Sequence, residues 1–372
     1  MSNLIQAERI GKLGFGYMRL PQKDGKDDIE QIIRMADAFI KSGGTYFDTA
    51  YTYDNSEVSL RESVIKRYPR DSVQIATKLY LRLASNIKQV DEQFRTSLDR
   101  LGTDYIDFYL LHGINAELSK NAEDLGVWLY LAELKEKGQI RHIGFSFHSS
   151  AEELDEILSK HPETDIVQLQ INYSDWENQS INSRGLYETA RKHHKPIVVM
   201  EPLKGGLLTS EASPIAELLH NANPDVSMAS WALRYTAELE GVLVTLSGMS
   251  TFEQVADNIA IFTDIKPLSA DEHAVLAKAV GIFNSVPRIE CTSCRYCVRD
   301  CPAKISIPSL IGIYNNYLIH NTLNNLSRSY MIWTKNAGRA RDCTACRVCE
   351  DSCPQHIEIV DALAKISGIF DS

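Results

Sequence analysis

All the cysteines of this chain, eight in number, lie near its C-terminal end in two runs with the same spacing. Each run reads C-x2-C-x2-C-x3-C-P, a spacing typical of cysteines that bind iron–sulfur clusters in bacterial-type ferredoxins. Each run supplies four thiolates, so the sequence predicts two 4Fe–4S clusters. The predicted ligands are Cys291, Cys294, Cys297, Cys301, Cys343, Cys346, Cys349 and Cys353.

Zinc sites and disulfides are the two other uses of such cysteines. Structural zinc sites usually pair one C-x2-C with a distant second pair, whereas each run here packs three cysteines closely and ends in Cys-Pro. Disulfide-dense domains are small and secreted, but this chain has 372 residues and confines its cysteines to one end. The pattern therefore favours iron–sulfur ligation.

In ferredoxins with two clusters, the fourth cysteine of each run binds the other cluster. We therefore predict two ligand sets that exchange their last members. The first set is Cys291, Cys294, Cys297 and Cys353, and the second is Cys343, Cys346, Cys349 and Cys301.

A second group of reactive side chains, Asp48, Tyr53, Lys78 and His112, follows short apolar segments early in the chain. Tyrosine is a poor proton donor at neutral pH because its usual pKa is about 10. A nearby ammonium lowers that pKa, and a carboxylate keeps the ammonium charged. A histidine can orient a carbonyl oxygen by a hydrogen bond. Such a set suits protonation of a carbonyl oxygen while a hydride reaches its carbon.

Each of these residues alone has a plainer explanation, such as a strand cap, an ion-pair partner or a rim histidine. Their positions at the ends of successive strands favour one shared site. Strand-like segments occur at residues 12–16, 45–48, 73–77, 106–111, 140–146, 166–171, 197–201 and 242–246. Helix-like segments between and after them occur at residues 29–41, 57–67, 90–101, 123–137, 152–160, 183–194, 226–235 and 253–263.

Eight alternating strand–helix units predict an α/β fold, a (β/α)8 TIM barrel, at residues 1–270. The alternative is an open doubly wound sheet, which would need G-x-G-x-x-G after the first strand. Gly14-Phe15-Gly16 has no third glycine, so the barrel is favoured. Helix-like segments at 271–285, 309–320 and 323–335 predict a small, mostly helical ferredoxin-like domain at residues 271–372.

The composition excludes several partners. The net charge is −10, which argues against nucleic acid because phosphate binding needs a basic surface. No uncharged apolar stretch is long enough to predict a membrane span. The N-terminal residues have no signal-peptide pattern. We therefore expect a cytoplasmic protein, in agreement with iron–sulfur thiolates in a reducing compartment.

Over about residues 8–265 the chain resembles the aldo-keto reductase family. The matching motifs are LGFG at 13–16, GGTYFDTA at 43–50 with Tyr53, TK at 77–78, DYIDFYLLH at 104–112, GQIRHIGFS at 138–146 and GMS at 248–250. The C-terminal part resembles the ferredoxin module of an iron–sulfur subgroup of that family.

The resemblance implies a catalytic tetrad of Asp48, Tyr53, Lys78 and His112, in which Tyr53 is the general acid and His112 orients the substrate. It also implies an NAD(P)H cofactor bound without a Rossmann fold, and reduction of a small-molecule aldehyde or ketone. Carboxamide contacts would come from Ser146, Gln168 and Asn172, and Met200 would cover the nicotinamide ring. The loops and helix that follow the last two strands would contribute Pro202, Leu203, Gly248, Ser250, Gln254 and Asn258.

The resemblance departs from the family at the site that would hold the 2′-phosphate of NADP. Residues 246–258 include no Lys or Arg, and Gln254 stands where the family often has an arginine. Glu253 and Asp257 would repel a phosphate. NAD and NADP both remain open as cofactors.

Two other functions are compatible with these motifs. The chain could be an electron-transfer protein that links nicotinamide to a ferredoxin or another redox partner, or a non-catalytic nucleotide or redox sensor. Direct transfer meets an obstacle, because nicotinamide moves two electrons as a hydride whereas a 4Fe–4S cluster takes one. The segment 115–124 and the side chains of Tyr17, Met18, Tyr51, Tyr80 and Trp176 are expected to line the substrate pocket.

Overall fold

The structure is a computed structural model that describes residues 10–320 and 323–371. Its contacts divide the chain into two compact units. The first unit holds the chain up to Pro202 together with Asp225–Ala270, and the second holds Leu203–Pro224 together with the chain from Asp271 onward. The units therefore interleave along the sequence, and the domain boundary at residue 270 stays a prediction.

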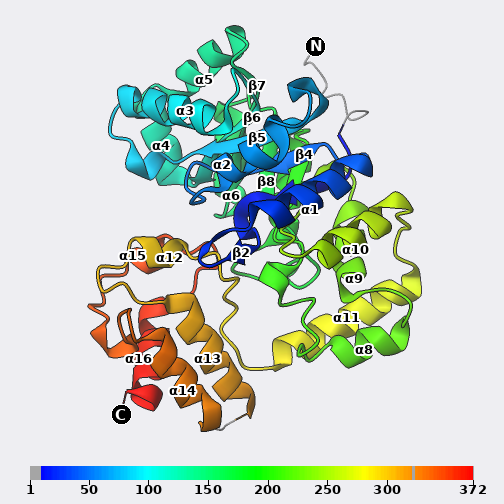
Figure 1. Ribbon diagram of the computed structural model, residues 1–372, viewed down its shortest axis with the longest axis vertical. Helices are drawn as coiled ribbons and strands as arrows, with labels where there is room; N and C mark the ends of the chain where they lie inside the picture. The colour runs from blue at the N-terminus through cyan, green and yellow to red at the C-terminus, as the bar shows by residue number, and fades with distance from the viewer. Residues whose placement is uncertain (1–9, 321–322, 372) are drawn as a thin grey trace. The chain divides into compact units, whose positions relative to one another are not determined.

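The predicted barrel is confirmed in the first unit. Its parallel strands close in the order β1-β10-β9-β8-β7-β6-β5-β4, and helices surround them (Figure 1). The register pairs Gly16 of β1 with Asp48 of β4, and Lys78 of β5 with Leu110 of β6. The strands are β1 Leu13–Gly16, β4 Tyr46–Asp48, β5 Gln74–Leu79, β6 Ile106–Ile114, β7 Ile140–Phe147, β8 Ile166–Gln170, β9 Ile197–Met200 and β10 Val242–Ser247.

The helices of the first unit cover the outside of the strands with apolar side chains, and several have side-chain N-caps. Asn86 accepts from Gln89 N at the start of α3, and Thr251 and Gln254 form a capping box at the start of α10, which satisfies amides that the helix leaves unpaired. The helices are α1 Ile29–Lys41, α2 Ser56–Leu60, α3 Ile87–Leu101, α4 Ala116–Asp124, α5 Val127–Glu136, α6 Ala151–Lys160, α7 Ser183–Lys192, α9 Met228–Ala237 and α10 Phe252–Thr263.

Two elements differ from the sequence-based expectation. The helix predicted at residues 123–137 is confirmed as α5, but its predicted start is wrong, because α4 ends at Asp124 and α5 begins at Val127. Gly126 between them has φ +72°, a left-handed conformation that favours glycine and ends a helix. A short hairpin, β2 Gln22–Lys23 with β3 Lys26–Asp27, was also not expected before α1.

The inside of the barrel is a small apolar core, so the barrel is not a channel. Its members include Tyr46, Phe108 and Val198, all buried. A filled interior leaves the ends of the strands as the place for chemistry.

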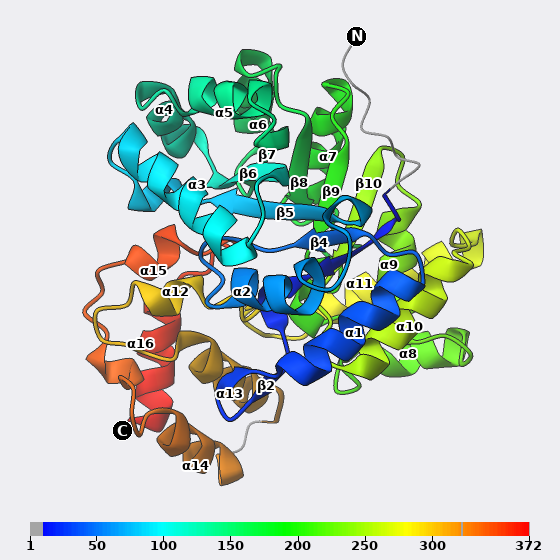
Figure 2. The same cartoon turned by 45° about the horizontal axis from the view of Figure 1, so that its top comes forward.

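The second unit is helical. Its core brings Cys297 and Cys349 together with apolar side chains such as Ile305, Leu310 and Ile359. Helices α12 and α15 lie side by side in Figures 1 and 2. The elements are α8 Ala216–Ala222, α11 Ala270–Ser285, α12 Tyr296–Arg299, α13 Ile307–His320, α14 Asn324–Trp333, η7 Ala340–Asp342, α15 Val348–Asp351 and α16 Ile359–Phe370.

The two cysteine runs are halves of a structural repeat that is longer than the cysteines themselves. In each run, three non-glycine residues at equivalent positions have a left-handed backbone, namely Ser293, Arg295 and Lys304, and then Ala345, Arg347 and His356. A short helix begins one residue before the third cysteine of each run, and α13 and α16 begin at equivalent positions, Ile307 and Ile359. Each run therefore curls around the space in front of its own cysteines. Of the described helices, none is both long and apolar enough to span a membrane.

Candidate active site and iron–sulfur centre

The structure brings Asp48 and Lys78 together as a buried ion pair at the ends of β4 and β5. Lys78 Nζ donates to Asp48 Oδ1 at 2.6 Å and to the Thr49 carbonyl oxygen at 2.7 Å. Both side chains are almost fully enclosed. Burial lowers the pKa of Lys78, and the charge of Asp48 opposes that shift, since a carboxylate favours the protonated ammonium.

Tyr53 and His112 complete the group. Lys78 Nζ lies 5.0 Å from the centroid of the Tyr53 ring, over its face. The centroids of the Tyr53 and His112 rings are 5.7 Å apart, edge to face. His112 also packs edge to face against Tyr80, again at 5.7 Å. All four predicted catalytic side chains thus meet at one mouth of the barrel, because β4, β5 and β6 are neighbours there.

A buried carboxylate that sequence reasoning missed supports this group from behind. Glu57 accepts from Thr77 Oγ1 at 2.7 Å and pairs with Arg100 Nη1 at 3.2 Å. Its charge also acts to raise the pKa of Lys78. Glu57 lies in α2, four residues after the predicted proton donor Tyr53. This spacing of about one helical turn was the only feature of the sequence that could have indicated a role for Glu57.

Among the predicted carboxamide contacts, Gln168 has a buried acceptor atom that a ligand could bind. Its Nε2 donates to Asp48 Oδ2 at 3.0 Å, while its buried Oε1 has no hydrogen-bond partner among the residues that the structure describes. Ser146 Oγ accepts from Gly113 N at 2.8 Å. Asn172 is already engaged, since its amide group donates to Asp175 Oδ2 and the Glu201 carbonyl and accepts from Asp175 N.

The loop after β10 has free space beside Gly248, whereas the residues that follow it are held by hydrogen bonds within the protein. A Cβ on Gly248 would have no atom nearer than 3.8 Å, the neighbour being Arg19, so a ligand group has room there. Ser250 Oγ donates to the Arg19 carbonyl at 2.6 Å, and Gln254 Oε1 accepts from Ser250 N at 2.7 Å. Asn258 is buried and donates to Ser247 Oγ at 2.6 Å. Gln254 therefore occupies helix-end amides that could otherwise face a phosphate.

Two arginines from elsewhere in the sequence approach these loops. Arg19 Nη2 pairs with Glu201 Oε1 at 2.9 Å, and Glu201 Oε2 is a buried oxygen without a hydrogen-bond partner among the described residues. Arg34 of α1 lies 5.3 Å from the centroid of the Phe252 ring. The pKa of Glu253 is lowered mainly by hydrogen bonds at the start of α10, and the charge of Arg34 adds to that shift. Arg34 lies far in sequence from residues 246–258, so its place beside α10 could not be predicted from that segment.

The remaining predicted cofactor residues are Met200, Pro202 and Leu203. Met200 ends β9 with a half-buried side chain, and Pro202 is buried. Leu203 belongs to the second unit.

The expected substrate pocket needs two corrections. Residues 116–124 form helix α4 rather than a loop. Tyr17 is buried, and its hydroxyl lies 3.0 Å from Ser63 Oγ, so it belongs to the core. Tyr80 does reach the site through His112, and Tyr51 stacks with Arg100 at 4.7 Å. Trp176 packs on Tyr187 and Tyr235.

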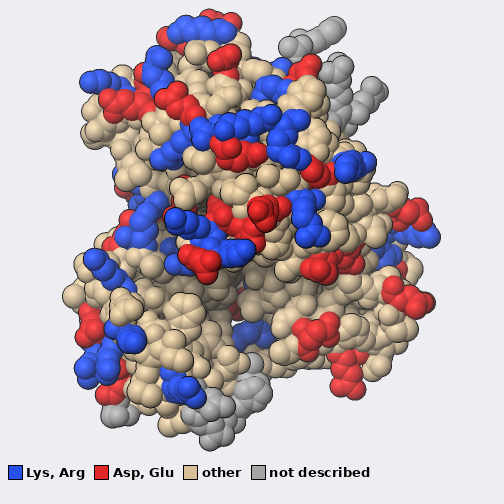
Figure 3. Space-filling model, viewed as in Figure 1, with Lys and Arg blue, Asp and Glu red and all other residues tan. Residues whose placement is uncertain are grey.

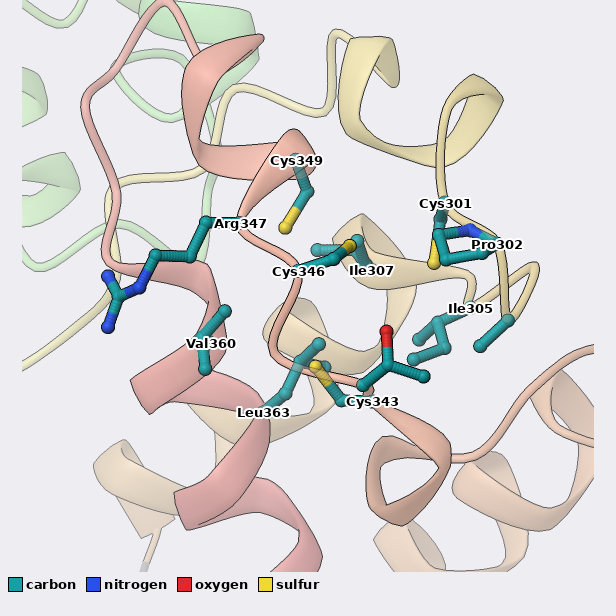
Figure 4. A pocket seen from close by; sticks show the side chains of 12 residues that line it. Cys301, Pro302, Ile305, Ile307, Cys343, Cys346, Arg347, Cys349, Val360 and Leu363 are labelled. Atoms are coloured by element: carbon teal, nitrogen blue, oxygen red, sulfur yellow. The ribbon is translucent and has the colours of Figure 1, made fainter.

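In the second unit the cysteines surround two cavities, each bordered by four of them. Cys291, Cys294, Cys297 and Cys353 line one, which we name the inner cavity. Cys301, Cys343, Cys346 and Cys349 line the other, which we name the outer cavity because Cys346 is exposed. The exchange of the fourth cysteine that the spacing predicts is thus present in the geometry. Figure 4 shows the sulfurs of the outer cavity turned toward one space and Arg347 directed away from it.

Most of the other residues that line the two cavities are apolar, and Ile307 borders both. Burial raises the pKa of Cys297 far above its usual range and that of Cys349 to about 11, with further contributions from neighbouring cysteines. Four negatively charged thiolates in a buried, mostly apolar cavity need a cation to balance them. A bound metal supplies that charge and deprotonates its thiol ligands. The donor set and the enclosure fit iron–sulfur clusters.

Several non-cysteine residues repeat around the two cavities, and sequence reasoning missed them. Thr292 and Thr344 follow the first cysteines, Arg295 and Arg347 follow the second ones, and Ile305 and Ile357 come four residues after the last ones. We assign packing roles in the cavity walls to the two threonines and the two isoleucines. Superimposing the two runs of sequence would have found this signal.

The second unit also ties the loop after β9 to the first cysteine run. Lys204, fully buried, pairs with Glu290 at 2.9 Å, directly before Cys291. Gly205 has φ +63°, and a Cβ there would lie 2.5 Å from the Thr292 carbonyl oxygen. Only glycine fits at this position.

A closed parallel barrel with this group at the ends of neighbouring strands defines an oxidoreductase of the aldo-keto reductase type. The family model described as "Aldo/keto reductase family" matches residues 12–280, which is most of the chain, so the protein belongs to the aldo/keto reductase family and is an NAD(P)H-dependent oxidoreductase. A second model, described as "4Fe-4S dicluster domain", matches residues 290–358.

Similar proteins match the barrel part. The chain is 30% identical over 215 residues to aldo-keto reductase str7 of Strobilurus tenacellus, covering 54% of this chain and 61% of that one. It is 27% identical to the NADH-specific methylglyoxal reductase of Escherichia coli, covering 59% of this chain and 79% of the other. A crystal structure of an aldo-keto reductase from Klebsiella pneumoniae in complex with NADPH has a TM-score of 0.59 at 23% identity, covering 76% of this chain and 94% of that one, and this likeness supports the fold.

Proposed function

We propose that this protein reduces the carbonyl group of a small aldehyde or ketone to an alcohol, with Tyr53 as the general acid. The observation that carries the proposal is the buried Lys78–Asp48 pair beneath the Tyr53 ring, with His112 at the ring edge. Bound NAD(P)H supplies the hydride to the carbonyl carbon. The Tyr53 hydroxyl gives its proton to the carbonyl oxygen, so the products are the alcohol and NAD(P)+.

Each side chain has a role that follows from its contacts. The Lys78 ammonium favours the phenolate that Tyr53 becomes after proton transfer, and Asp48 holds that ammonium in place and charged. His112, in an almost fully buried position, hydrogen-bonds the carbonyl oxygen and presents it to Tyr53. Gln168 Oε1, a buried acceptor with no hydrogen-bond partner among the described residues, accepts from the nicotinamide carboxamide.

Tyr53→Phe tests the assignment. We expect turnover of a broad aldehyde panel to fall by about a hundredfold to ten-thousandfold, while nucleotide binding and the cluster absorbance stay unchanged. Tyr68→Phe is the matched control, because the Tyr68 hydroxyl donates to Asp37 of α1 and not to a group of the site. Full activity of Tyr53→Phe would show that another group supplies the proton.

We also propose that the protein uses NADH at least as well as NADPH. Residues 246–258 bring no cation to the 2′-position, and Glu253 is exposed there. The name of the Escherichia coli relative indicates that NADH use occurs among similar chains. Arg34 is the counter-candidate, because it lies beside the start of α10.

Steady-state kinetics with both cofactors, on the wild type and on Arg34→Ala, test this preference. We expect comparable kcat/KM values and no selective loss of NADPH use in the variant. A preference of about a hundredfold for NADPH would overturn the proposal, and its loss in Arg34→Ala would assign the 2′-phosphate to that arginine.

For the second unit we propose two 4Fe–4S clusters, one in each cavity, that exchange electrons with a separate ferredoxin or another redox protein. The arrangement of four cysteines around each of two adjoining cavities supports this. Anaerobic purification with iron and sulfide quantitation tests the number of clusters, and EPR during NADH titration tests whether nicotinamide reduces them. An iron content that matches a single cluster would contradict the proposal.

A further inference from the structure

The helical insert between the two cysteine runs has a one-sided charge. Between Asp300 and Asp342 the sequence has no Asp or Glu, although the whole chain has a net charge of −10. The basic residues of this stretch are Lys304, Arg328, Lys335, Arg339 and Arg341. Figure 3 shows Lys and Arg side chains at the lower left of the view, with Asp and Glu side chains between them. The insert is thus a cationic segment in an acidic protein.

The end of α14 adds exposed apolar side chains to that charge. Met331, Ile332 and Trp333 are 60%, 64% and 52% exposed. Consecutive residues of a helix point in different directions, so this helix end projects into solvent. We name Met331, Ile332, Trp333, Lys335 and Arg341 the α14 surface; Lys335 and Arg341 are exposed as well.

The other side of α14 is firmly held. Tyr330 is buried, stacks on Phe370 at 5.2 Å and donates its hydroxyl to Asp371 Oδ2 at 2.8 Å. The same hydroxyl accepts from Ala340 N at 2.9 Å. The exposed side chains therefore stand on a fixed element, as a docking surface requires.

The α14 surface lies one short segment away from the outer cavity. Gly338 forms a bridge with Ile305 and donates to the Lys304 carbonyl at 3.2 Å. Ile305 borders the outer cavity, and η7 leads directly into Cys343, one of its four cysteines. Arg341 of the α14 surface thus comes two residues before Cys343, and Cys346 of the same cavity is exposed.

We propose that the α14 surface docks an acidic protein that carries a one-electron redox centre. Charge favours this partner, since an acidic face complements a segment without acidic residues. Trp, Met and Arg are enriched in protein interfaces, and electron-transfer encounters bury little area. The exchange moves one electron between the partner's centre and the cluster site, with no bond formed or broken and no proton transferred. This inference rests on the clusters of the proposed function.

The test measures binding to a defined probe, an acidic [2Fe–2S] ferredoxin, by anaerobic calorimetry with the full holoprotein. We expect binding that weakens as ionic strength rises from about 0.02 M to about 0.2 M. We expect Trp333→Ala, and separately Lys335→Glu with Arg341→Glu, to raise the Kd about tenfold or more. Lys278→Glu is the matched control, an exposed lysine of α11 in the same unit, and it should leave the Kd unchanged.

Further measurements separate docking from structure. Iron and sulfide content, the unfolding midpoint and carbonyl turnover should be the same in the α14-surface variants and the wild type. Absence of ferredoxin binding by the wild type, or equal binding by the variants, overturns the proposal. The proposal is also overturned if the wild type binds anionic phospholipid vesicles instead of the ferredoxin and Trp333→Ala does not bind them.

Sedimentation decides between a partner and a second copy of this chain. A wild-type dimer that Trp333→Ala dissociates would assign the surface to self-association and overturn the proposal. If no clusters are found, the proposed function of the second unit fails first. If clusters are present and the ferredoxin does not bind, only the docking inference fails.

Discussion

The barrel mouth and the cysteine cavities solve the problem of buried charge in opposite ways. At the barrel mouth the charge of Lys78 is balanced by protein side chains, with Asp48 at 2.6 Å and Glu57 behind it. Around the cavities, thiols such as Cys297 and Cys349 are buried among apolar side chains and other cysteines, and burial raises their pKa values. Groups of the polypeptide therefore balance the charge of the first site, whereas the second site fits an inorganic group that deprotonates its thiol ligands.

The largest expected effect comes from Lys78→Met in the barrel. Turnover should fall by about a hundredfold to ten-thousandfold, and the free energy of unfolding by about 3–5 kcal/mol because Asp48 is left buried and unpaired. Denaturant titration and steady-state kinetics measure the two effects. The double variant Lys78→Met with Asp48→Asn should regain stability but not turnover. A single variant that unfolds no earlier than the wild type would contradict the balanced-pair interpretation.

Cys297→Ala tests the other side of the comparison. The inner cavity loses one ligand, so the iron content should fall by one cluster and the second unit should become sensitive to proteolysis, since Cys297 is part of its core. Carbonyl turnover should persist, because the four predicted catalytic side chains all belong to the first unit. Ser293→Ala, an exposed neighbour in the same loop, is the control. Loss of turnover together with the cluster would show that the two sites depend on each other.

Gly205→Ala should have a smaller effect, confined to the second unit. A Cβ at Gly205 would meet the Thr292 carbonyl oxygen, and the backbone there is left-handed, so we expect a loss of about 1–3 kcal/mol of stability. Gly206→Ala is the matched control, because Gly206 is also left-handed but has open space around its Cβ position. Equal losses in the two variants would show that the contact with Thr292 is unimportant. Thermal unfolding of both holoproteins makes the measurement.

Glu57→Gln should give the smallest effect, a shift in the pH profile. Asp48 and Glu57 both act to raise the pKa of Lys78, while burial lowers it. Removing the Glu57 charge lowers the pKa of Lys78 further, so the alkaline limb of kcat/KM should move to lower pH with little change in its plateau. Gln can still accept from Thr77. Glu62→Gln, in the next turn of the chain where Glu62 pairs with Lys66, should leave the profile unchanged, and an unshifted limb in Glu57→Gln would remove Glu57 from the site.

Local patterns made much of the fold predictable. The 13-residue helix α1 has the bounds that its apolar periodicity predicts, and the barrel strands agree with the apolar segments to within a few residues. The break between α4 and α5 was missed because Leu125-Gly126 interrupts a helical pattern without a proline. The π-helical turn Arg61–Ile65 after α2 was missed as well, since its pattern is helical throughout.

Spacing along the chain and the ends of strands are local properties, so the two cysteine runs, the barrel and the candidate tetrad could be predicted from the sequence alone. The further groups around these sites are seen only in the folded structure. Glu57 accepts from Thr77 and pairs with Arg100, Arg34 lies against Phe252 of α10, and Leu203–Pro224 belongs to the second unit. These contacts join residues far apart in the chain, and they depend on how strands and helices pack, which no periodicity of a single segment encodes.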